Sequence, residues 1–429
     1  EELRARRGIC SAVTTRERGE ERAHRDGCPH REARAVAWTQ KGRHSLANIL
    51  RTRQSMRLRP LLLGVALVAC ADEKPSLNTS ATLADSAIRD TGRVNVSAGT
   101  IDTPPGSRET PPTATQRGAR QDTGDYPVLR GLYLNRFAAQ SARKMRHLLA
   151  VADSTEINAF IVDMKDEFGL NYRSANPEFR KYAGSGRGMV GNVRALVDSM
   201  KAHGVVPVAR IVAFKDPVAA EANGAWTIRR EDGSVWRDKE GLAWVNAHNK
   251  EVWEFNLGVA EELVKLGFEE IQWDYIRFPE PYRSLPKQVF PGATLSKPDI
   301  LAEFLKEAQG RLHRLGARNT ADIFGLVTTV RGPLEVGQHW EKISPHIDVV
   351  LPMVYPSHYP RGAFGIERPN AEPYAIIKKA IDAARERDEK LGITRAEHVR
   401  PWIQAFSLGQ PKYGPEQITA QKQAIYDAG

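Results

Sequence analysis

Short apolar runs alternate with amphipathic stretches along the chain from about Tyr126 onward. The apolar runs predict strands, which we place at 129–135, 158–164, 205–214, 268–276, 321–328, 347–355 and 399–407. Between them, apolar residues recur at helical spacing and predict helices near 141–153, 191–203, 248–266, 298–315, 373–389 and 415–428. Strands that alternate with helices indicate a parallel sheet with both faces covered. Such units repeated over roughly 300 residues favour an α/β fold of the (β/α)8 TIM-barrel type over a doubly wound sheet.

The C-terminal end of this pattern bears on how the barrel closes. The last predicted helix reaches Gly429, where the sequence ends. A closed (β/α)8 barrel needs one more strand after that helix. We therefore expect a barrel that is truncated before its eighth strand.

The segment 56–70 has the layout of an export signal. Met56 is the first methionine and is followed by a short basic stretch, an apolar run at 61–69 and Cys70. The apolar run is far shorter than the about 20 residues that a membrane-spanning helix needs. The sequence LVAC at 67–70 resembles the lipobox of bacterial lipoproteins. This resemblance implies that Cys70 is the lipidated first residue of the mature chain, although an ordinary signal peptide that happens to end in cysteine is the alternative.

Residues 1–55 are rich in arginine and glutamate and show no sustained apolar period. One interpretation is a basic nucleic-acid-binding arm, and the other, which we prefer, is a mistranslated or disordered upstream segment. The chain carries 62 Lys+Arg and 52 Asp+Glu, of which residues 1–59 hold 15 and 7. The remainder therefore carries 47 basic and 45 acidic residues, which gives no case for nucleic acid as a partner.

Residues 71–125 form a linker between this signal and the predicted barrel. The segment is dense in Ser, Thr, Asp, Pro and Gly and has few large apolar residues, so it predicts disorder. Residues 126–429 form the barrel domain. No cysteine follows Cys70, so this domain must be stabilised by its core and not by disulfides.

Charged residues stand where several predicted strands end. In a parallel barrel the active site is built at the C-terminal ends of the strands and in the loops that follow them. Asp163 ends one such run, Arg210 the next and Asp274 the one after. Because side chains alternate along a strand, we expect Asp163 and Lys165 to share one face, and Asp163, Arg210 and Asp274 to converge at one mouth. Ion pairs that merely fix loops are the structural alternative.

Four segments then resemble successive motifs of a known family. They are NAFIVDMKD at 158–166, VARIVAFKD at 208–216, QWDYIRFP at 272–279 and PMVYPSH at 352–358. Together they are similar to the bacterial family called "Putative glycosyl hydrolase domain", over about residues 128–429. The resemblance implies a barrel related to α-amylase-like glycosidases.

The resemblance also implies roles for particular carboxyl groups. It makes Asp274 the nucleophile and places a second carboxyl group at the end of the fifth strand. From Ile323 the end of that strand reads IFGLVT, in which we find no carboxylate. We therefore expect Asp163 to be the catalytic partner of Asp274, ahead of Asp166 and Glu280.

Further residues at the same strand ends are candidates for holding substrate. They are Lys165, Asp166, Arg210, Arg277, Tyr355, His358 and Gln404. Trp226, Trp236 and Trp244 either stack on sugars or pack a hairpin around Asp232-Gly233. The spacing of His, Cys and acidic residues predicts no metal and no cofactor. The sequence contains no Gly-x-Ser-x-Gly motif, so it does not indicate a serine hydrolase.

Two functions follow as expectations. The first is an exported glycoside hydrolase that acts on a polysaccharide or cell-envelope glycan and is held to a bacterial membrane by its lipid. The second is a lipoprotein with the same barrel that binds carbohydrate, or serves as an envelope scaffold, without catalysis. Fold alone does not decide between them.

Overall fold

A computed structural model of the chain describes residues 128–183 and 188–429. The predictions for residues 1–55, the signal at 56–70 with Cys70, and the linker at 71–125 lie outside these residues. Within them, no helix is long and apolar enough to cross a membrane.

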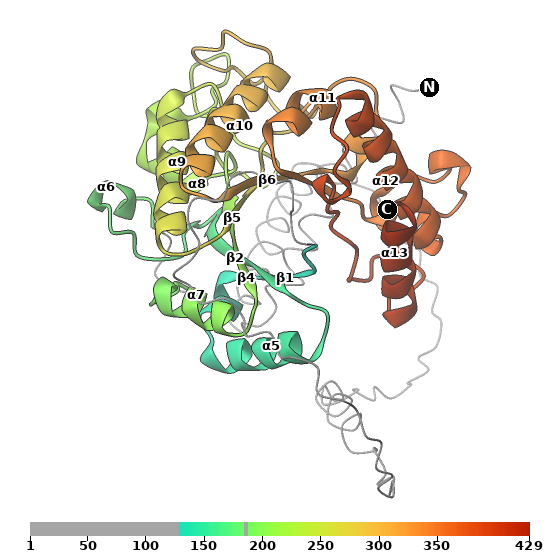
Figure 1. Cartoon of the computed structure of the whole chain (residues 1–429). Coiled ribbons are helices and arrows are strands. Elements are labelled where there is room, and N and C mark those ends of the chain that lie inside the picture. Colours follow the sequence, from blue (N-terminus) through green and yellow to red (C-terminus); the bar gives the residue numbers. More distant parts are fainter. Residues whose placement is uncertain (1–127, 184–187) are drawn as a thin grey trace, which may run out of the picture. The chain divides into compact units, whose positions relative to one another are not determined.

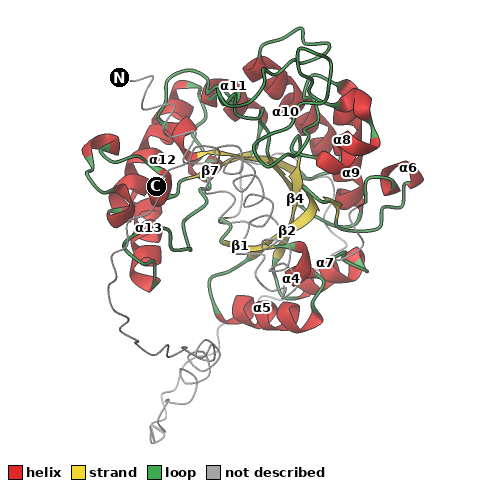
Figure 2. Cartoon of the chain, turned by 180° about the vertical axis from the view of Figure 1, so that it is seen from behind, coloured by secondary structure: helices red, strands yellow, loops and turns green. Residues whose placement is uncertain are grey.

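The framework is a curved parallel sheet with helices on its outer side (Figures 1 and 2). Its strands lie in the order β1-β2-β4-β5-β6-β7. Their bounds are Gly131–Leu134, Ala159–Asp166, Val206–Val212, Glu270–Asp274, Arg318–Phe324 and Val349–Met353. A two-residue strand, β3 (Gly169–Leu170), pairs antiparallel with the end of β2. The sheet curls into a half-barrel, as expected for a (β/α)8 fold that stops short of closing.

The strand that the sequence predicts after β7 is only partly formed. The prediction of a strand at 399–407 is reduced in the structure to two parallel bridges, Val350 to Val399 and Met353 to Trp402. Arg400 N and Trp402 N donate to Val350 O and Pro352 O at 2.9 and 3.0 Å. Pro401 stands between them at a position whose N–H would point away from β7, so its missing N–H group does not interrupt this pairing. In the described part of the chain no strand pairs with the free edge of β1.

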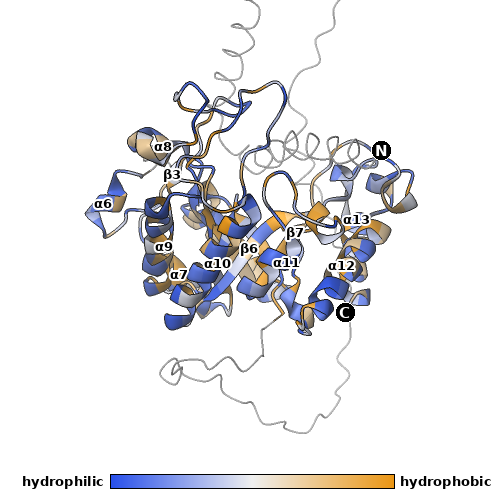
Figure 3. Cartoon of the chain, turned by 90° about the horizontal axis from the view of Figure 1, so that it is seen from above, coloured by the Kyte–Doolittle hydropathy of each residue, from blue (hydrophilic) through white to orange (hydrophobic). Residues whose placement is uncertain are grey.

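The outer layer consists of amphipathic helices, which Figure 3 shows with hydrophilic and hydrophobic residues side by side. The predicted helices are confirmed, each within two residues at either end. Their bounds are Ala142–Ser154 (α5), Val193–Ala202 (α7), Lys250–Lys265 (α9), Lys297–Arg314 (α10), Pro373–Lys390 (α12) and Pro415–Asp427 (α13). Short helices α4 (Arg136–Ala139), α6 (Pro177–Arg180), α8 (Pro217–Ala222) and α11 (Trp340–Ile343) lie in the connections.

Local sequence explains where these helices begin. Asn192, Asn249 and Ser296 precede α7, α9 and α10, and each side chain accepts a hydrogen bond from a backbone N–H of the first turn.

Aromatic rings fill the layer between the helices and the sheet. Trp273 of β5 and Trp253 of α9 both pack edge-on against Phe304 of α10.

Strand β6 departs from its predicted range of 321–328. It begins at Arg318, and the residues 325–328 form a 3-10 helix. Its polar start is stabilised by Glu270, which is fully buried, pairs with Arg318 at 3.2 Å and accepts from Thr320 Oγ1 at 3.1 Å. A Cβ on Gly325 would lie 2.4 Å from Met353 O, so the chain turns there at a residue that lacks a side chain.

Candidate active site

Arg210 lies at the centre of a cluster of buried carboxyl groups. Its Nη1 donates to Asp163 Oδ1 at 2.5 Å, its Nε donates to Asp274 Oδ2 at 3.0 Å, and its Nη2 also contacts Asp274. The three residues come from adjacent strands, because β4 lies between β2 and β5 and Asp163 is registered with Arg210. The structure thus brings together the three residues that strand alternation places at one mouth.

Asp274 is held at both oxygen atoms. It ends β5, and the next residue, Tyr275, has a positive φ of 49°. This left-handed conformation is uncommon for a residue with a large side chain. It turns the N–H of Tyr275 back onto Asp274 Oδ1 at 2.6 Å, while Arg210 holds Oδ2. Unusual backbone conformations of this kind concentrate at functional sites.

A third carboxyl group, Asp322, joins the cluster and was missed in the sequence. It lies in β6, with Oδ2 4.0 Å from Arg210 Nε. Gln272 Nε2 donates to both of its oxygens at 2.9 Å, and Trp402 Nε1 donates to Oδ1 at 2.6 Å. The expectation that the fifth strand has no carboxylate was therefore wrong. Asp322 lies inside the predicted range of 321–328 but before Ile323, from which the end of the strand was read. The pairing of Thr320 with Gln272 turns Asp322 toward the cluster.

The carboxyl groups are close enough to act on one bond. Asp163 and Asp274 contact one planar guanidinium group, so their contacting oxygens are at most about 8 Å apart. The distances of 3.0 and 4.0 Å from Arg210 Nε place the Oδ2 atoms of Asp274 and Asp322 at most about 7 Å apart. Both limits lie below about 9.5 Å, the upper end of the carboxyl spacing in glycoside hydrolases.

Burial changes the acidity of this cluster. It raises the pKa of Asp163 from 3.8 to about 6, against the opposing charge of Arg210. Burial, assisted by the negative charge of Asp274, raises the pKa of Asp322 well above its ordinary value. The site therefore contains carboxyl groups that keep a proton at mildly acidic pH, which is what a general acid requires.

Lys165 does not lie where alternation predicts. The ladder between β2 and β4 shifts register after Asp163, so Lys165 pairs with Ile211 on the opposite face. Its ammonium is fully buried, donates to Val212 O at 2.5 Å and pairs with Asp216 at 2.8 Å. The expectation that Lys165 shares the face of Asp163 was wrong because a bulge reverses the alternation, and this lysine stabilises the layer beneath the helices.

Asp166 and Arg277 are held by interactions within loops. Asp166 Oδ1 accepts from Phe168 N at 2.8 Å and lies 3.6 Å from Arg136 Nη1. Arg277 Nη1 pairs with Glu280 Oε1 at 3.2 Å, and both side chains are buried. These contacts shape the loops after β2 and β5.

Tyr355, His358 and Gln404 lie together beyond β7. The rings of Tyr355 and His358 are 5.2 Å apart. Gln404 is fully buried and accepts from Ser357 N at 3.0 Å, while its Nε2 donates to Phe406 O at 3.1 Å. Gln404 therefore positions the turn that presents Tyr355 and His358.

The three tryptophans after β4 are packing residues. Trp226, Trp236 and Trp244 are all buried, and each indole N–H has a partner within the domain. For Trp236 the partner is Pro286 O at 2.8 Å. Of the two interpretations, local packing is the one that the structure supports. Among the residues described, no group of three or more His, Cys, Asp or Glu is placed to hold a metal ion.

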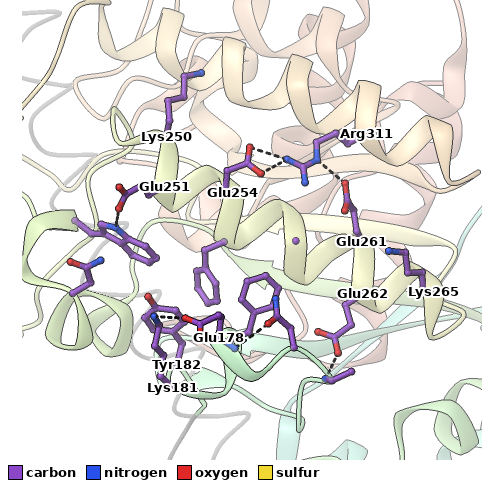
Figure 4. A pocket seen from close by; sticks show the side chains of 17 residues that line it. Glu178, Lys181, Tyr182, Lys250, Glu251, Glu254, Glu261, Glu262, Lys265 and Arg311 are labelled. Atoms are coloured by element: carbon purple, nitrogen blue, oxygen red, sulfur yellow. Dashed lines mark hydrogen bonds and ion pairs between the residues drawn. The ribbon is translucent and has the colours of Figure 1, made fainter.

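A pocket of about 930 Å³ lies away from this cluster, between α6 and the outer side of α9 (Figure 4). Its carboxylates have partners: Glu254 and Glu261 bind Arg311, and Glu251 accepts from Trp226 Nε1. None of the candidate catalytic residues lines it.

Comparison with known proteins adds a family and several structural likenesses. A family model described as "Putative glycosyl hydrolase domain" matches residues 131–429. No curated protein matches the chain. A hypothetical protein from Ruminiclostridium thermocellum ATCC 27405 is 33% identical, over 42% of this chain and 92% of that one, with a TM-score of 0.39.

Two solved enzymes are more distant. The spore cortex-lytic enzyme SleL of Bacillus megaterium QM B1551 is 13% identical, over 70% of this chain and 59% of that one, with a TM-score of 0.38. The α-galactosidase TtGalA of Thermus thermophilus, in complex with stachyose, is 12% identical, over 69% and 59%, with a TM-score of 0.42. The chain thus spans less than two thirds of the length of either enzyme.

Proposed function

The chain belongs to the family described as "Putative glycosyl hydrolase domain", and we propose that it cleaves glycosidic bonds with Asp274 and Asp163. The observation that carries this proposal is the pair of carboxyl groups on one guanidinium group. Arg210 binds Asp163 at 2.5 Å and Asp274 at 3.0 Å, at the ends of neighbouring strands. Glycoside hydrolysis uses two carboxyl groups on either side of the scissile bond.

The two groups have different tasks. Asp163, whose pKa burial raises to about 6, is the general acid that delivers its proton to the glycosidic oxygen. Asp274 acts as the ionised partner, oriented by Arg210 and by the N–H of Tyr275. It either attacks the anomeric carbon or removes a proton from the attacking water, depending on the separation of the two groups with substrate bound.

Asp322 is the second candidate for the acid. It lies on the fifth strand, where the family resemblance places such a group, and burial raises its pKa well above the ordinary value. Its oxygens already accept from Gln272 and Trp402, and its side chain is only 2% exposed. Asp163 is enclosed to the same degree, since it is 3% exposed and accepts from Arg210 and Tyr133. We rank Asp322 behind Asp163 because Asp163 contacts Arg210 directly, whereas Asp322 lies 4.0 Å from it, and we expect Asp322 to tune the charge of the cluster.

The substrate and the location complete the proposal. We infer that the protein acts outside the cytoplasm on a polysaccharide or cell-envelope glycan, held to a bacterial membrane by a lipid on Cys70. The signal-like stretch at 56–69 and the LVAC sequence support this inference. Neither a metal nor a cofactor is part of the proposed reaction.

Assay of the purified chain against peptidoglycan, chitin, xylan, cellulose and starch tests the function. We expect release of reducing sugar from at least one of them, and loss of that release in Asp274→Asn. Asp382→Asn is the matched control, because Asp382 is an exposed aspartate on α12 with a side chain 47% accessible. Binding of a glycan without turnover by the unmodified chain would favour a carbohydrate-binding protein instead.

A further inference from the structure

Two cations contact the ring of Tyr275, the residue that follows Asp274 at the end of β5. Tyr275 is buried, with 4% of its surface exposed. Lys215 Nζ, from the loop after β4, lies 4.8 Å from the centre of this ring and 3.5 Å from its hydroxyl oxygen. The guanidinium carbon of Arg277 lies 4.9 Å from the same ring centre. A cation within about 6 Å of an aromatic ring centre is attracted to the ring, so both groups restrain Tyr275.

Both cations are themselves fixed in place. Their side chains are buried, and the attraction between a cation and a ring is strongest where water is excluded. Lys215 Nζ lies 3.7 Å from Glu240 Oε2, and Arg277 Nη1 donates to Phe278 O at 3.2 Å. The ring of Tyr275 is therefore held from two separate loops, the one after β4 and the one after β5.

The backbone of Tyr275 requires such restraint. Its φ of 49° is left-handed, a conformation that costs free energy in a residue with a side chain. In this conformation its N–H donates to Asp274 Oδ1 at 2.6 Å, and a relaxed backbone would turn that donor away. The cost of the conformation and the attraction between a cation and a buried ring are of the same order, so the ring contacts can offset the strain.

We propose that Lys215 and Arg277 are positioning residues for Asp274. By holding the ring of Tyr275, they keep this residue in the conformation that aims its N–H at the carboxylate. The inference rests on the proposed function, in which Asp274 is the ionised partner, and deepens it by assigning residues that act on Asp274 through Tyr275. The sequence placed Arg277 among the residues that hold substrate, and this assignment gives it a different task.

Hydrogen exchange at the amide of residue 275, measured on the full chain, tests the restraint without a substrate. Lys215→Met and Arg277→Met remove a charge but keep an unbranched side chain. Tyr275→Gly removes the ring and adopts a left-handed conformation readily. Lys215→Arg, Arg277→Lys and Tyr275→Phe keep a cation or a ring at each position, so they are the matched controls.

We expect protection of the residue 275 amide to fall at least about tenfold in Lys215→Met, Arg277→Met and Tyr275→Gly, and to stay within about threefold of the native value in the controls. Lys215→Met keeps the ring and the other cation, so it serves where either of the other two variants fails to fold.

Kinetics of the same variants test the effect on Asp274, with the polysaccharide that the unmodified chain cleaves as substrate. Lys215→Met should lose about ten- to a hundredfold in kcat/KM, because a displaced carboxylate slows the reaction. The inhibition constant of the released product should stay within about threefold, since neither cation is assigned to the substrate. A residue that only stabilises the fold would leave kcat/KM of the folded variant unchanged, and Lys215→Arg should restore most of the loss.

Unchanged protection at residue 275 in Lys215→Met overturns the inference, and so does a loss of protection that leaves kcat/KM within about threefold of the native value. An inhibition constant that rises as far as kcat/KM falls also overturns it, because Lys215 would then bind substrate. Inactivity of the unmodified chain on every polysaccharide of the panel contradicts the proposed function, and the exchange measurement then decides alone whether the two cations hold Tyr275.

Discussion

Replacing Asp163 with asparagine should make the protein more stable at neutral pH, although it removes a partner of Arg210. Asparagine resembles the protonated carboxyl group, so the variant avoids the cost of ionising a buried acid. Burial raises the pKa of Asp163 from 3.8 to about 6, which means that the folded state holds this proton more tightly than the unfolded state. Active sites commonly carry such a cost in stability.

The difference between the folded and unfolded pKa of Asp163 sets the size of the effect. A tenfold change in proton affinity corresponds to about 1.4 kcal/mol, so the rise in pKa from 3.8 to about 6 costs the native chain about 3 kcal/mol once the group is ionised in both states. A raised pKa in the folded state stabilises below the unfolded value, and that stabilisation is lost as pH rises through the folded value. The free energy of unfolding should therefore fall between about pH 4 and pH 6 because of this group.

Urea unfolding of the native chain and of Asp163→Asn, at steps from about pH 4.5 to 7.5, measures the difference directly. As pH rises, the free energy of unfolding of the variant should exceed that of the native chain by an increasing amount, up to about 3 kcal/mol. Asp232→Asn is the control, because hydrogen bonds from Ser234 lower the pKa of that exposed carboxyl group, so no gain should appear. A pH-independent difference, or a variant that loses stability as pH rises, would refute the reasoning about Asp163.

Three further predictions concern other parts of the domain. Asp388→Ala should lower the free energy of unfolding by about 3–5 kcal/mol in a urea titration, because this buried carboxylate accepts from a tryptophan, a serine and a histidine at 2.6–2.8 Å; a loss under about 1 kcal/mol would contradict it. Gly258→Ala should lower the free energy of unfolding by about 1–3 kcal/mol, since the new Cβ would lie 2.6 Å from the Phe179 ring. Phe179→Leu should relieve part of that loss, and a double variant whose loss is the sum of the two single losses would argue against the contact. Tyr133→Phe should move the alkaline limb of the pH–rate profile to higher pH, because its hydroxyl group lowers the pKa of the proposed acid, whereas a purely structural tyrosine would change the rate without moving the limb.

The sequence allowed much of the fold to be predicted because local pattern and tertiary structure agree there. Helices such as α9 and α10 have amphipathic spacing and polar caps, which are local features. Asp163, Arg210 and Asp274 could be placed together for the same reason, because each follows a buried run in a straight ladder. Alternation along a strand is then enough to assign a face.

The misses occur where pairing between strands overrides the local pattern. Lys165 changed face because the ladder shifts register after Asp163, and nothing in the sequence of β2 marks that bulge. Asp322 was overlooked because the carboxyl group was sought from Ile323 onward, whereas the pairing of Thr320 with Gln272 is what turns Asp322 toward the cluster. Trp402 follows a proline in a strand of two bridges, so its meeting with Tyr133 depends on how far the sheet curls.

The central claim is that Asp274 and Asp163 divide nucleophilic and acidic work on one glycosidic bond. A leaving group that departs as a stable anion needs no proton, so loss of a general acid matters little for it. The most direct test compares 2,4-dinitrophenyl glycosides with the natural oligosaccharide as substrates of Asp163→Asn and Asp274→Asn. The account predicts that Asp163→Asn loses at least about a hundredfold in kcat/KM on the oligosaccharide but retains most of its kcat/KM on the dinitrophenyl substrate, whereas Asp274→Asn loses both. Equal losses of kcat/KM on both substrates for Asp163→Asn, or full activity of Asp274→Asn on either, would contradict it.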